Sequence, residues 1–383
     1  MTTKKLSIAY VTPVLLSFFV MSFCDLVGIG VDNAKADFQL NNTLAQLIPL
    51  AVFAWFFILS VPVGIMQDRI GKKNMLNIGM LLTAMGLILP FLSYSFPALL
   101  SGFALLGIGN TIIQVSANPL LIDVVPSNRA SSFLSFSQFV KSIGSMVAPY
   151  LATFLAAQFG DWKILLLVFG GISVLSVIWL HFSQIEETVS KEKKATIGSC
   201  LKLLSISYIG LMVLGIFFVV GIDVGINAAS GQFLMEKLGM DAEPAKQGRS
   251  LYFFGKMLGT FLGALLLTRI SSRKFFLGSA FATVITLVLF TYAPTPFSAL
   301  TMMFAVGLAA SNIFPLIFSL TVQRYEERSN EISGLMIMAV SGGAILPPVI
   351  GKVSDLANIG TGMFVLVFSA LYLLTLSFYA FKK

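Results

Sequence analysis

The chain has 383 residues, of which 57% are hydrophobic and 11% are charged. Soluble domains carry roughly 25% charged residues and cannot hide so much apolar surface, so we expect lipid to be the solvent. The formal net charge of +8 is therefore interpreted as a signal of membrane topology, and nucleic-acid binding is excluded as a function.

Twelve apolar segments follow one another along the chain, each long enough for a membrane-spanning helix of about 20 residues. The fold class that they predict is an all-α membrane protein, with twelve transmembrane helices in two pseudo-symmetric halves of six. The predicted spans are residues 6–31, 45–66, 74–95, 97–122, 131–158, 163–183, 206–235, 248–268, 275–293, 297–322, 331–353 and 360–381.

A hydrophilic segment separates the two halves. We expect an N-terminal six-helix half at 1–183, a cytoplasmic linker at 184–205 and a C-terminal half at 206–383. The linker contains the run EETVSKEKKAT and is expected to be solvated. The first helix of each half carries an acid among glycines, Asp25 in one and Asp223 in the other. Such internal duplication is typical of secondary transporters, whose sites lie near the bilayer midplane between the repeats.

The basic residues predict the orientation. With both termini inside, 17 of the 25 lysines and arginines lie on the cytoplasmic side, 6 lie outside and 2 lie within helices. Because cytoplasmic loops carry the excess of basic residues, we expect a multi-pass protein of the cell inner (plasma) membrane with both termini cytoplasmic.

Four charged side chains interrupt the apolar segments: Asp25, Lys141, Asp223 and Lys256. A charge at the centre of a membrane helix costs about 2.5–3.5 kcal/mol, so such groups are kept where they pair or face a wet cavity. We expect charge pairs of Lys141 with Asp25 and of Lys256 with Asp223. For Asp25 two interpretations stay open: a permanent pair that pins two helices together, or a proton carrier, since an apolar, glycine-lined site favours the neutral acid. For Asp223, a structural or gating pair with Lys256 is favoured over direct proton coupling.

After the second predicted helix the sequence is GIMQDRIGKK, residues 64–73. This run resembles the signature loop between helices 2 and 3 of the major facilitator superfamily. The resemblance implies a gating role, in which the aspartate caps a neighbouring helix and the arginine reaches a carboxylate. The gating residues implied are Gly64, Asp68, Arg69, Gly71, Lys72 and Lys73.

A closer resemblance, over nearly the whole chain, is to the fucose:proton symporter family and its glucose/galactose permease relatives. The runs that carry it are QVSANPLL, SFSQFVKSIGS, VGIDVGINAASGQFL, GKMLGTFL, SNIFPLIFSL and SGGAILPPVIGKVSD. The resemblance implies import of a sugar by proton symport with alternating access. At Gln114 the chain differs from fucose permease, which has a glutamate, and is similar to the glucose/galactose relatives, which have a glutamine. At Lys141 it departs from the family, which has an asparagine.

Amides in the middle of the predicted helices suit a hydroxyl-rich ligand, because they both donate and accept hydrogen bonds. The expected substrate-binding residues are Gln114, Asn118, Gln138, Lys141, Asn227 and Asn312, and the expected proton-coupling residues are Asp25 and Asp223. For each amide alone, a hydrogen bond between helices is an equally good interpretation. The ammonium group of Lys141 leaves open an acidic sugar, such as a hexuronate or sialic acid.

Other function classes are weighed on the same residues. The sequence has no nucleotide-binding P-loop, no His/Cys metal spacing and no nucleophile elbow, so we expect neither an enzyme nor a metal site. We expect no cofactor beyond the coupling proton, for which sodium is the alternative. The expected partners are a small-molecule sugar and the lipid bilayer, with no nucleic acid, and the protein is expected to be a monomer. A sensor that binds sugar without moving it is the alternative from another class.

Overall fold

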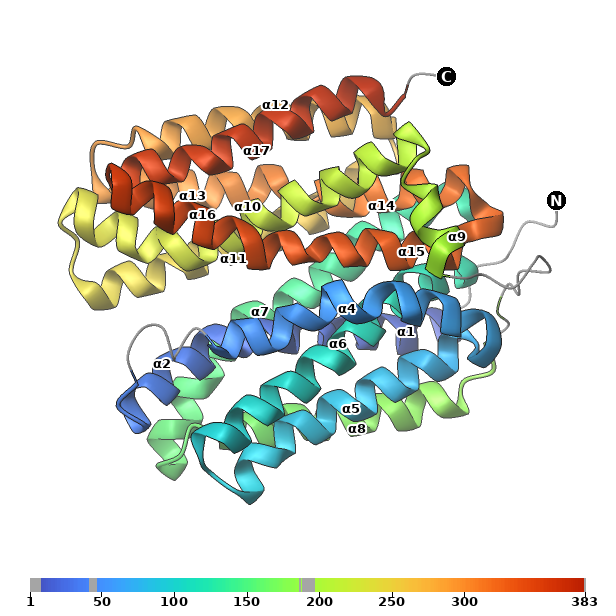
Figure 1. Ribbon diagram of the computed structural model, residues 1–383, viewed down its shortest axis with the longest axis horizontal. Helices are drawn as coiled ribbons and strands as arrows, with labels where there is room; N and C mark the ends of the chain where they lie inside the picture. The colour runs from blue at the N-terminus through green and yellow to red at the C-terminus, as the bar shows by residue number, and fades with distance from the viewer. Residues whose placement is uncertain (1–7, 41–46, 186, 188–196, 382–383) are drawn as a thin grey trace. The chain divides into compact units, whose positions relative to one another are not determined.

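The computed structural model describes residues 8–40, 47–185, 187 and 197–381, and every regular element within these ranges is a helix (Figure 1). The predicted all-α fold class is confirmed. Eleven segments of the described residues are long and apolar enough to cross a membrane. The remaining expected span, 248–268, is also helical, but α11 (Ala242–Leu266) is less apolar because it carries Arg249 and Lys256.

The chain forms two compact units. Unit 1 consists of Met1–Ala130, Val140–Lys202 and Val322–Met338, and unit 2 consists of Ser131–Phe139, Leu203–Thr321 and Ala339–Lys383. Each unit therefore takes most of one half of the sequence and one short segment of the other. The predicted division at residues 184–205 stays a prediction.

In unit 1 the central helix is α6, which packs against α4 and α5, while α5 also packs against α8 and α4 also packs against α15. The bounds are α1 (Ile8–Met21), η1 (Ser22–Leu26), α2 (Val27–Asp37), α4 (Leu47–Ile70), α5 (Lys72–Leu92), α6 (Phe96–Val124), η2 (Ser127–Arg129), α8 (Ile164–Phe182), α9 (Ile197–Leu203), η3 (Glu326–Arg328) and α15 (Ser329–Met338). Helix α7 (Ala130–Phe159) gives residues 131–139 to unit 2 and 140–159 to unit 1.

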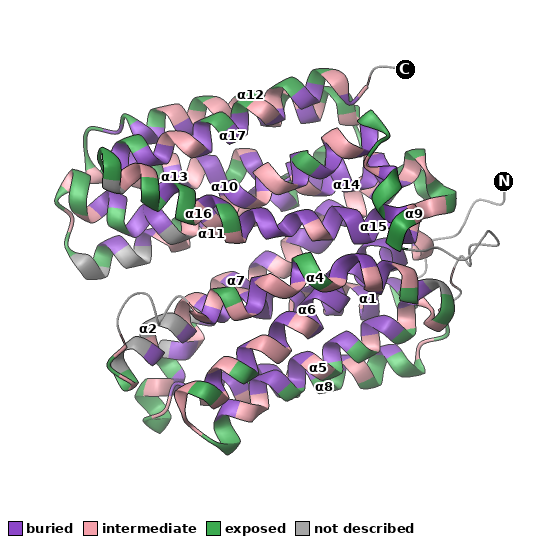
Figure 2. Ribbon diagram, in the orientation of Figure 1, coloured by how far each residue is buried: buried purple, intermediate pink, exposed green. Residues whose placement is uncertain are grey.

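Small residues set the spacing of α5 and α6. A methyl group on Gly109 would lie 2.5 Å from the carbonyl oxygen of Gly79, so the two backbones are in contact there. Close approach through small residues is how membrane helices associate in the absence of a hydrophobic driving force. Residues 109–121 of α6 are all buried, which makes this helix the core of unit 1 (Figure 2).

In unit 2, α10 packs against α11, α16 and α17, and α13 packs against α11 and α12. The bounds are α10 (Ser207–Leu238), α11 (Ala242–Leu266), α12 (Ser272–Thr291), α13 (Pro296–Ala310), α14 (Ile313–Arg324), η4 (Ala339–Ser341), α16 (Gly342–Leu356) and α17 (Ile359–Tyr379), with the last turn of α14 in unit 1.

Three expected spans are interrupted helices. The first, expected over 6–31, contains the 3₁₀ segment η1 at Ser22–Leu26, and the eleventh contains η4 at Ala339–Ser341. The tenth, expected over 297–322, is divided at Ser311 and Asn312 into α13 and α14. Pro315 accounts for this last break, because a proline has no N–H to donate to the carbonyl of the residue four positions earlier, which is Ser311.

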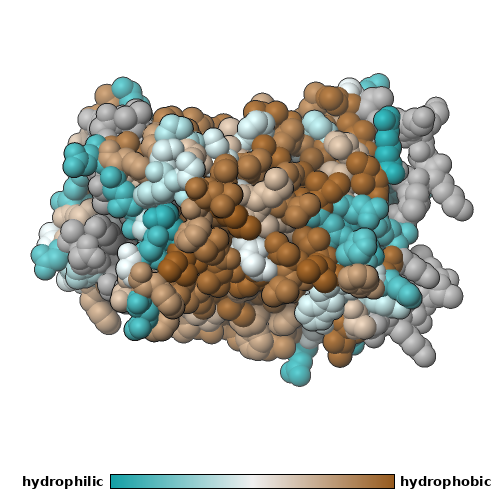
Figure 3. Space-filling model, turned by 90° about the horizontal axis from the view of Figure 1, so that it is seen from below, coloured by the Kyte–Doolittle hydropathy of each residue, from teal (hydrophilic) through white to brown (hydrophobic). Residues whose placement is uncertain are grey.

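The surface is that of a membrane protein. On the face shown in Figure 3, hydrophobic side chains form a broad middle zone, and hydrophilic side chains gather toward the two ends. Large apolar side chains are exposed on the outer helices, among them Phe57 on α4, Leu175 and Trp179 on α8, and Phe368 on α17. Soluble proteins rarely expose apolar patches of this extent to water, whereas in a bilayer such side chains contact the lipid chains.

Candidate transport site

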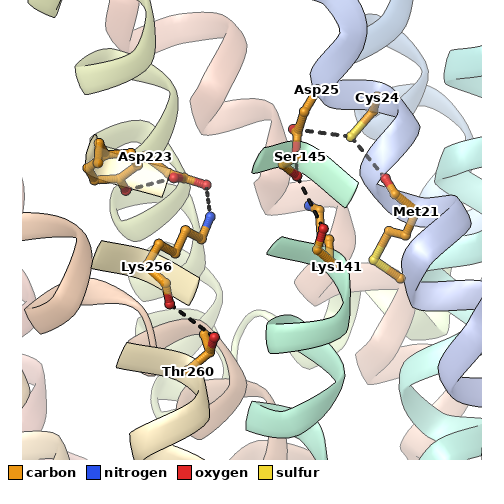
Figure 4. Close-up of polar contacts among 9 residues, drawn as sticks. Met21, Cys24, Asp25, Lys141, Ser145, Asp223, Lys256 and Thr260 are labelled. Carbon is orange, nitrogen blue, oxygen red and sulfur yellow. Dashed lines mark hydrogen bonds and ion pairs between the residues drawn. The ribbon is translucent and has the colours of Figure 1, made fainter. Parts of the chain in front are cut away.

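The acid of unit 1 lies at the interruption of the first span. Asp25 belongs to η1, and the hydroxyl of Ser145 on α7 donates to its Oδ2 atom at 2.5 Å (Figure 4). The Cys24 thiol lies 3.6 Å from its Oδ1 atom. Lys141 lies one turn before Ser145, and its carbonyl oxygen is 3.3 Å from the Ser145 hydroxyl. The structure thus brings Asp25 to the α7 turn that carries Lys141, while the pairing of the two charges stays a prediction.

The helix α6 carries a ladder of buried amides. Asn110 donates to the carbonyl of Met21 at 2.9 Å, and Gln114 donates to the side chain of Asn110 at 3.0 Å. Asn118 donates to the carbonyl of Gln114 at 2.7 Å. Asn110 was not predicted, although its spacing of four from Gln114 and of eight from Asn118 places all three on similar faces of the helix.

One of these amides makes a hydrogen bond between helices, the alternative to substrate binding: Asn110 connects α6 to the end of α1. The Oδ1 atom of Asn118 is buried and has no hydrogen-bond partner among the described residues. A buried acceptor without a partner costs about 1–3 kcal/mol, so this oxygen is the part of the ladder best suited to a ligand hydroxyl. Substrate binding by Gln114 and Asn118 stays a prediction.

The acid of unit 2 lies in a complete ion pair. Lys256 Nζ on α11 is 2.5 Å from Oδ2 of Asp223 on α10, and the two side chains point toward one another (Figure 4). The hydroxyl of Tyr252, one turn before Lys256, donates to Oδ1 of the same carboxylate at 2.7 Å. Both carboxylate oxygens therefore accept hydrogen bonds from α11. Tyr252 was missed at the sequence level, because only the register of α10 against α11 brings its hydroxyl to Asp223.

The remaining predicted amides are placed differently. Asn312, at the break between α13 and α14, donates to the carbonyl of Gly259 at 2.6 Å and to Ser311 Oγ at 2.9 Å. Its Oδ1 atom is buried without a partner in the described part of the chain. Asn227 is half-buried on α10, one turn after Asp223, and Gln138 is buried on α7 within unit 2. Their roles in binding stay predictions.

Residues 64–73, for which a gating role is predicted, lie at one end of unit 1. A methyl group on Gly64 would lie 2.6 Å from the carbonyl oxygen of Asn330, so α4 and α15 touch through their backbones there. Gly71 has φ 88° between α4 and α5, a conformation that glycine adopts without strain. Arg69 is exposed, and its expected contact with a carboxylate stays a prediction. The side chain of Asp68 lies outside the described residues.

The two lysines of this loop anchor it. The Nζ atom of Lys72, only 3% exposed, lies 2.6 Å from Asp123 at the end of α6. The Nζ atom of Lys73 donates to the carbonyl of His181 at 2.9 Å, within the last turn of α8, and to that of Ser183 at 2.6 Å, just after the helix ends. These contacts connect the start of α5 to the ends of two neighbouring helices.

Glu187 caps α5. Its carboxylate accepts from the backbone N–H groups of Lys72 at 2.5 Å and Lys73 at 2.9 Å. A carboxylate at a helix N-terminus satisfies free N–H groups and interacts favourably with the helix dipole. Glu187 belongs to the segment expected to be a solvated linker; this half-buried residue contacts α5, and the expectation for the segment stays a prediction. No local pattern identifies a cap that lies 115 residues away in sequence.

A second polar cluster lies at the other end of α5. Asp37 accepts from the hydroxyl of Tyr94 and, at 3.2 Å, from the indole N–H of Trp162. The ammonium of Lys163 lies 4.0 Å from the centre of the Tyr94 ring. Burial, with a smaller contribution from the hydrogen bond to Asp37, raises the pKa of Tyr94, so this phenol stays protonated and continues to donate. The cluster connects the end of α2 to the loops beside α5 and α8.

Helices of membrane length, with charges and amides inside them, define a multi-pass membrane protein with polar sites within its bundles. The sequence matches the family model described as the Major Facilitator Superfamily over residues 13–222 and again over 211–383. The chain therefore belongs to the Major Facilitator Superfamily.

Two relatives and one solved structure give the comparison more detail. The chain is 30% identical to a glucose/galactose transporter of Brucella abortus, over 91% of this chain and 88% of the relative. It is 22% identical to the L-fucose-proton symporter of Escherichia coli, over 91% and 88% respectively.

A crystal structure of the transporter FucP in the outward conformation matches the fold with a TM-score of 0.85 and 20% identity, covering 98% of this chain and all of that one. The resemblance seen in the sequence is thereby confirmed. These relatives are transporters and not enzymes.

Proposed function

We propose that this protein imports a neutral hexose together with protons by alternating access. The observation that carries the proposal is Asp25: a carboxylate inside a membrane-spanning segment, contacted by the neutral donors Ser145 and Cys24. A serine hydroxyl can donate to the ionised acid and accept from the neutral one, so this contact serves both forms of the carboxyl group. The relatives, a glucose/galactose transporter and an L-fucose-proton symporter, support a sugar as the cargo.

Alternating access requires contacts that form in one state and separate in the other. The backbone contact of α4 with α15 at Gly64 is our candidate for the cytoplasmic gate. Lys72 and Lys73 hold the start of α5 to the ends of α6 and α8, so we expect these three helices to move as one piece. We place the gate on the side of the inner membrane that also holds the termini, in agreement with the distribution of basic residues.

A second candidate is an acidic sugar as cargo. Lys141 places an ammonium group in a membrane-spanning helix, one turn from the serine that contacts Asp25. A cation there suits a carboxylate-bearing ligand such as a hexuronate. The coupling ion in either case is a proton in our proposal, with sodium as the alternative.

Counterflow in proteoliposomes tests the proposal. Purified protein is reconstituted with unlabelled sugar inside, and entry of the labelled sugar is followed with no proton gradient. Glucose, galactose, fucose, glucuronate and N-acetylneuraminate form the panel. We expect exchange of at least one neutral hexose; exchange of the acids alone supports the second candidate. Sugar that binds without exchanging overturns transport in favour of a sensor.

A further inference from the structure

The two membrane acids differ in the chemistry of their contacts. The carboxylate of Asp223 accepts from a lysine ammonium at 2.5 Å and from a tyrosine hydroxyl at 2.7 Å. The carboxylate of Asp25 is contacted by a serine hydroxyl and a cysteine thiol. A charged donor on one oxygen and a hydroxyl on the other stabilise the ionised carboxylate, whereas neutral donors serve either form.

Close helix packing fixes the pair that contains Asp223. A methyl group on Gly307 of α13 would lie 2.2 Å from the carbonyl oxygen of Tyr252, and one on Gly255 of α11 would lie 2.1 Å from that of Phe304. Thus α11 rests directly on the α13 backbone at the turn that carries Tyr252 and Lys256. The side chain of Tyr252 is 1% exposed, so its hydroxyl has little freedom to leave Asp223.

The helix that carries Asp223 is equally constrained. A methyl group on Gly221 would lie 2.0 Å from Leu346 of α16, and one on Gly225 would lie 2.7 Å from Leu366 of α17. Residues two positions before and after Asp223 are therefore packed against neighbouring helices of unit 2. In contrast, Asp25 lies in the 3₁₀ segment that interrupts the first span, and such interruptions often mark functional hinges.

We propose that Asp223, Lys256 and Tyr252 form a permanent ion-pair unit that keeps its charges through the transport cycle, so that the coupled proton travels on Asp25 alone. Tyr252 is a positioning residue in this unit: it acts on transport only through the carboxylate that it holds. The inference rests on the proposed sugar:proton symport and assigns different roles to the two acids expected to couple protons.

The test compares two readouts for each reconstituted variant: counterflow, which needs no net proton movement, and accumulation of sugar driven by an imposed proton gradient. The central variant is the neutral pair Asp223→Asn/Lys256→Met, which keeps the approximate shapes and removes both charges. A second variant, Asp223→Lys/Lys256→Asp, keeps both charges with their places exchanged. Asp25→Asn is the matched control on the other acid.

We expect both pair variants to exchange and to accumulate sugar, at a lowered rate but with the wild-type ratio of accumulation to exchange. Asp25→Asn should exchange sugar and accumulate none. A neutral pair that exchanges sugar but cannot accumulate it overturns the inference, because Asp223 would then carry the proton. If the wild-type protein exchanges no sugar at all, it is the proposed function that fails.

A mutant cycle isolates the role of Tyr252. Tyr252→Phe removes the hydroxyl and keeps the ring. If the tyrosine acts through Asp223, we expect its loss to slow counterflow about fivefold or more in the wild type and by less than about twofold in the neutral-pair background, since no carboxylate is left to position. An equal loss in both backgrounds would mean that only the packing of the ring matters, and would overturn the positioning role.

Discussion

Replacing Gly64 with alanine should force α4 and α15 apart. The added methyl carbon would lie 2.6 Å from the carbonyl oxygen of Asn330 and 3.2 Å from the Cα atom of Gly334, where ordinary contacts begin at 3.4 Å. Both are backbone atoms, which cannot rotate away, so the helices themselves must separate. Overpacking of this kind costs about 1–3 kcal/mol. The alanine's better helix propensity, about 1 kcal/mol, acts in both states and does not offset this cost.

The state in which α4 and α15 touch should therefore lose population. A difference of 1–2 kcal/mol changes a two-state ratio by a factor of about 5–30. The net free energy that holds these helices together is reduced further, because the Ser333 hydroxyl and the Gln67 amide, one turn from the contact, are buried without partners among the described residues. Each such group costs about 1–3 kcal/mol while the helices stay together.

Thiol labelling measures this population. Ser333 is fully buried on α15, so Ser333→Cys in a Cys24→Ser/Cys200→Ser background reacts with a maleimide only after separation. We expect Gly64→Ala to raise the labelling rate about 5–30-fold. Gly278→Ala on α12 is the matched control, since nothing lies within 4 Å of its added methyl. Equal labelling rates in the two variants would refute the assignment of this contact as the gate.

Three further substitutions test the site. Gly71→Ala should lower the thermal midpoint, because a φ of 88° costs an L-residue about 1–3 kcal/mol; an unchanged melting curve contradicts this. Glu187→Gln keeps the shape of the cap but removes its charge, so we expect a loss of about 0.3–1 kcal/mol that shrinks with added salt; a salt-independent loss would count against the electrostatic cap. Gly263→Ala places a methyl 2.2 Å from the Asn312 amide and should displace its hydrogen bond to Gly259. We expect a higher KM for sugar with counterflow capacity retained, and a wild-type KM would remove Asn312 from the binding site.

The spans and the partners of the second acid were within reach of sequence reasoning. Apolar segments of membrane length predict helices, because in lipid the backbone N–H and C=O groups must form hydrogen bonds within the same helix. The sequence predicts the pair of Asp223 with Lys256 because an unpaired charge in lipid is costly, and the other basic residues within the predicted spans of the second half, Arg249 and Lys352, lie next to the ends of their spans.

Features that depend on helix register were out of reach. Tyr252 resembles many aromatic residues of the spans until α10 places Asp223 beside its hydroxyl. Glu187 caps a helix that starts 115 residues earlier, so no local sequence pattern predicts this contact. The interruption at η1 carries no proline, and we have no physical account of why the helix tightens there. Asn110 was the one missed residue with a usable signal, its spacing of four from Gln114.

The central claim, that sugar enters with a proton carried on Asp25, is tested most directly by proton uptake. Sugar is added to weakly buffered proteoliposomes, and the external pH is followed with a glass electrode. For the wild type we predict alkalinisation that starts with the sugar and is abolished by a protonophore. For Asp25→Asn we predict no pH change while counterflow continues. Sugar uptake by the wild type without any alkalinisation, or alkalinisation that persists in Asp25→Asn, would contradict the account.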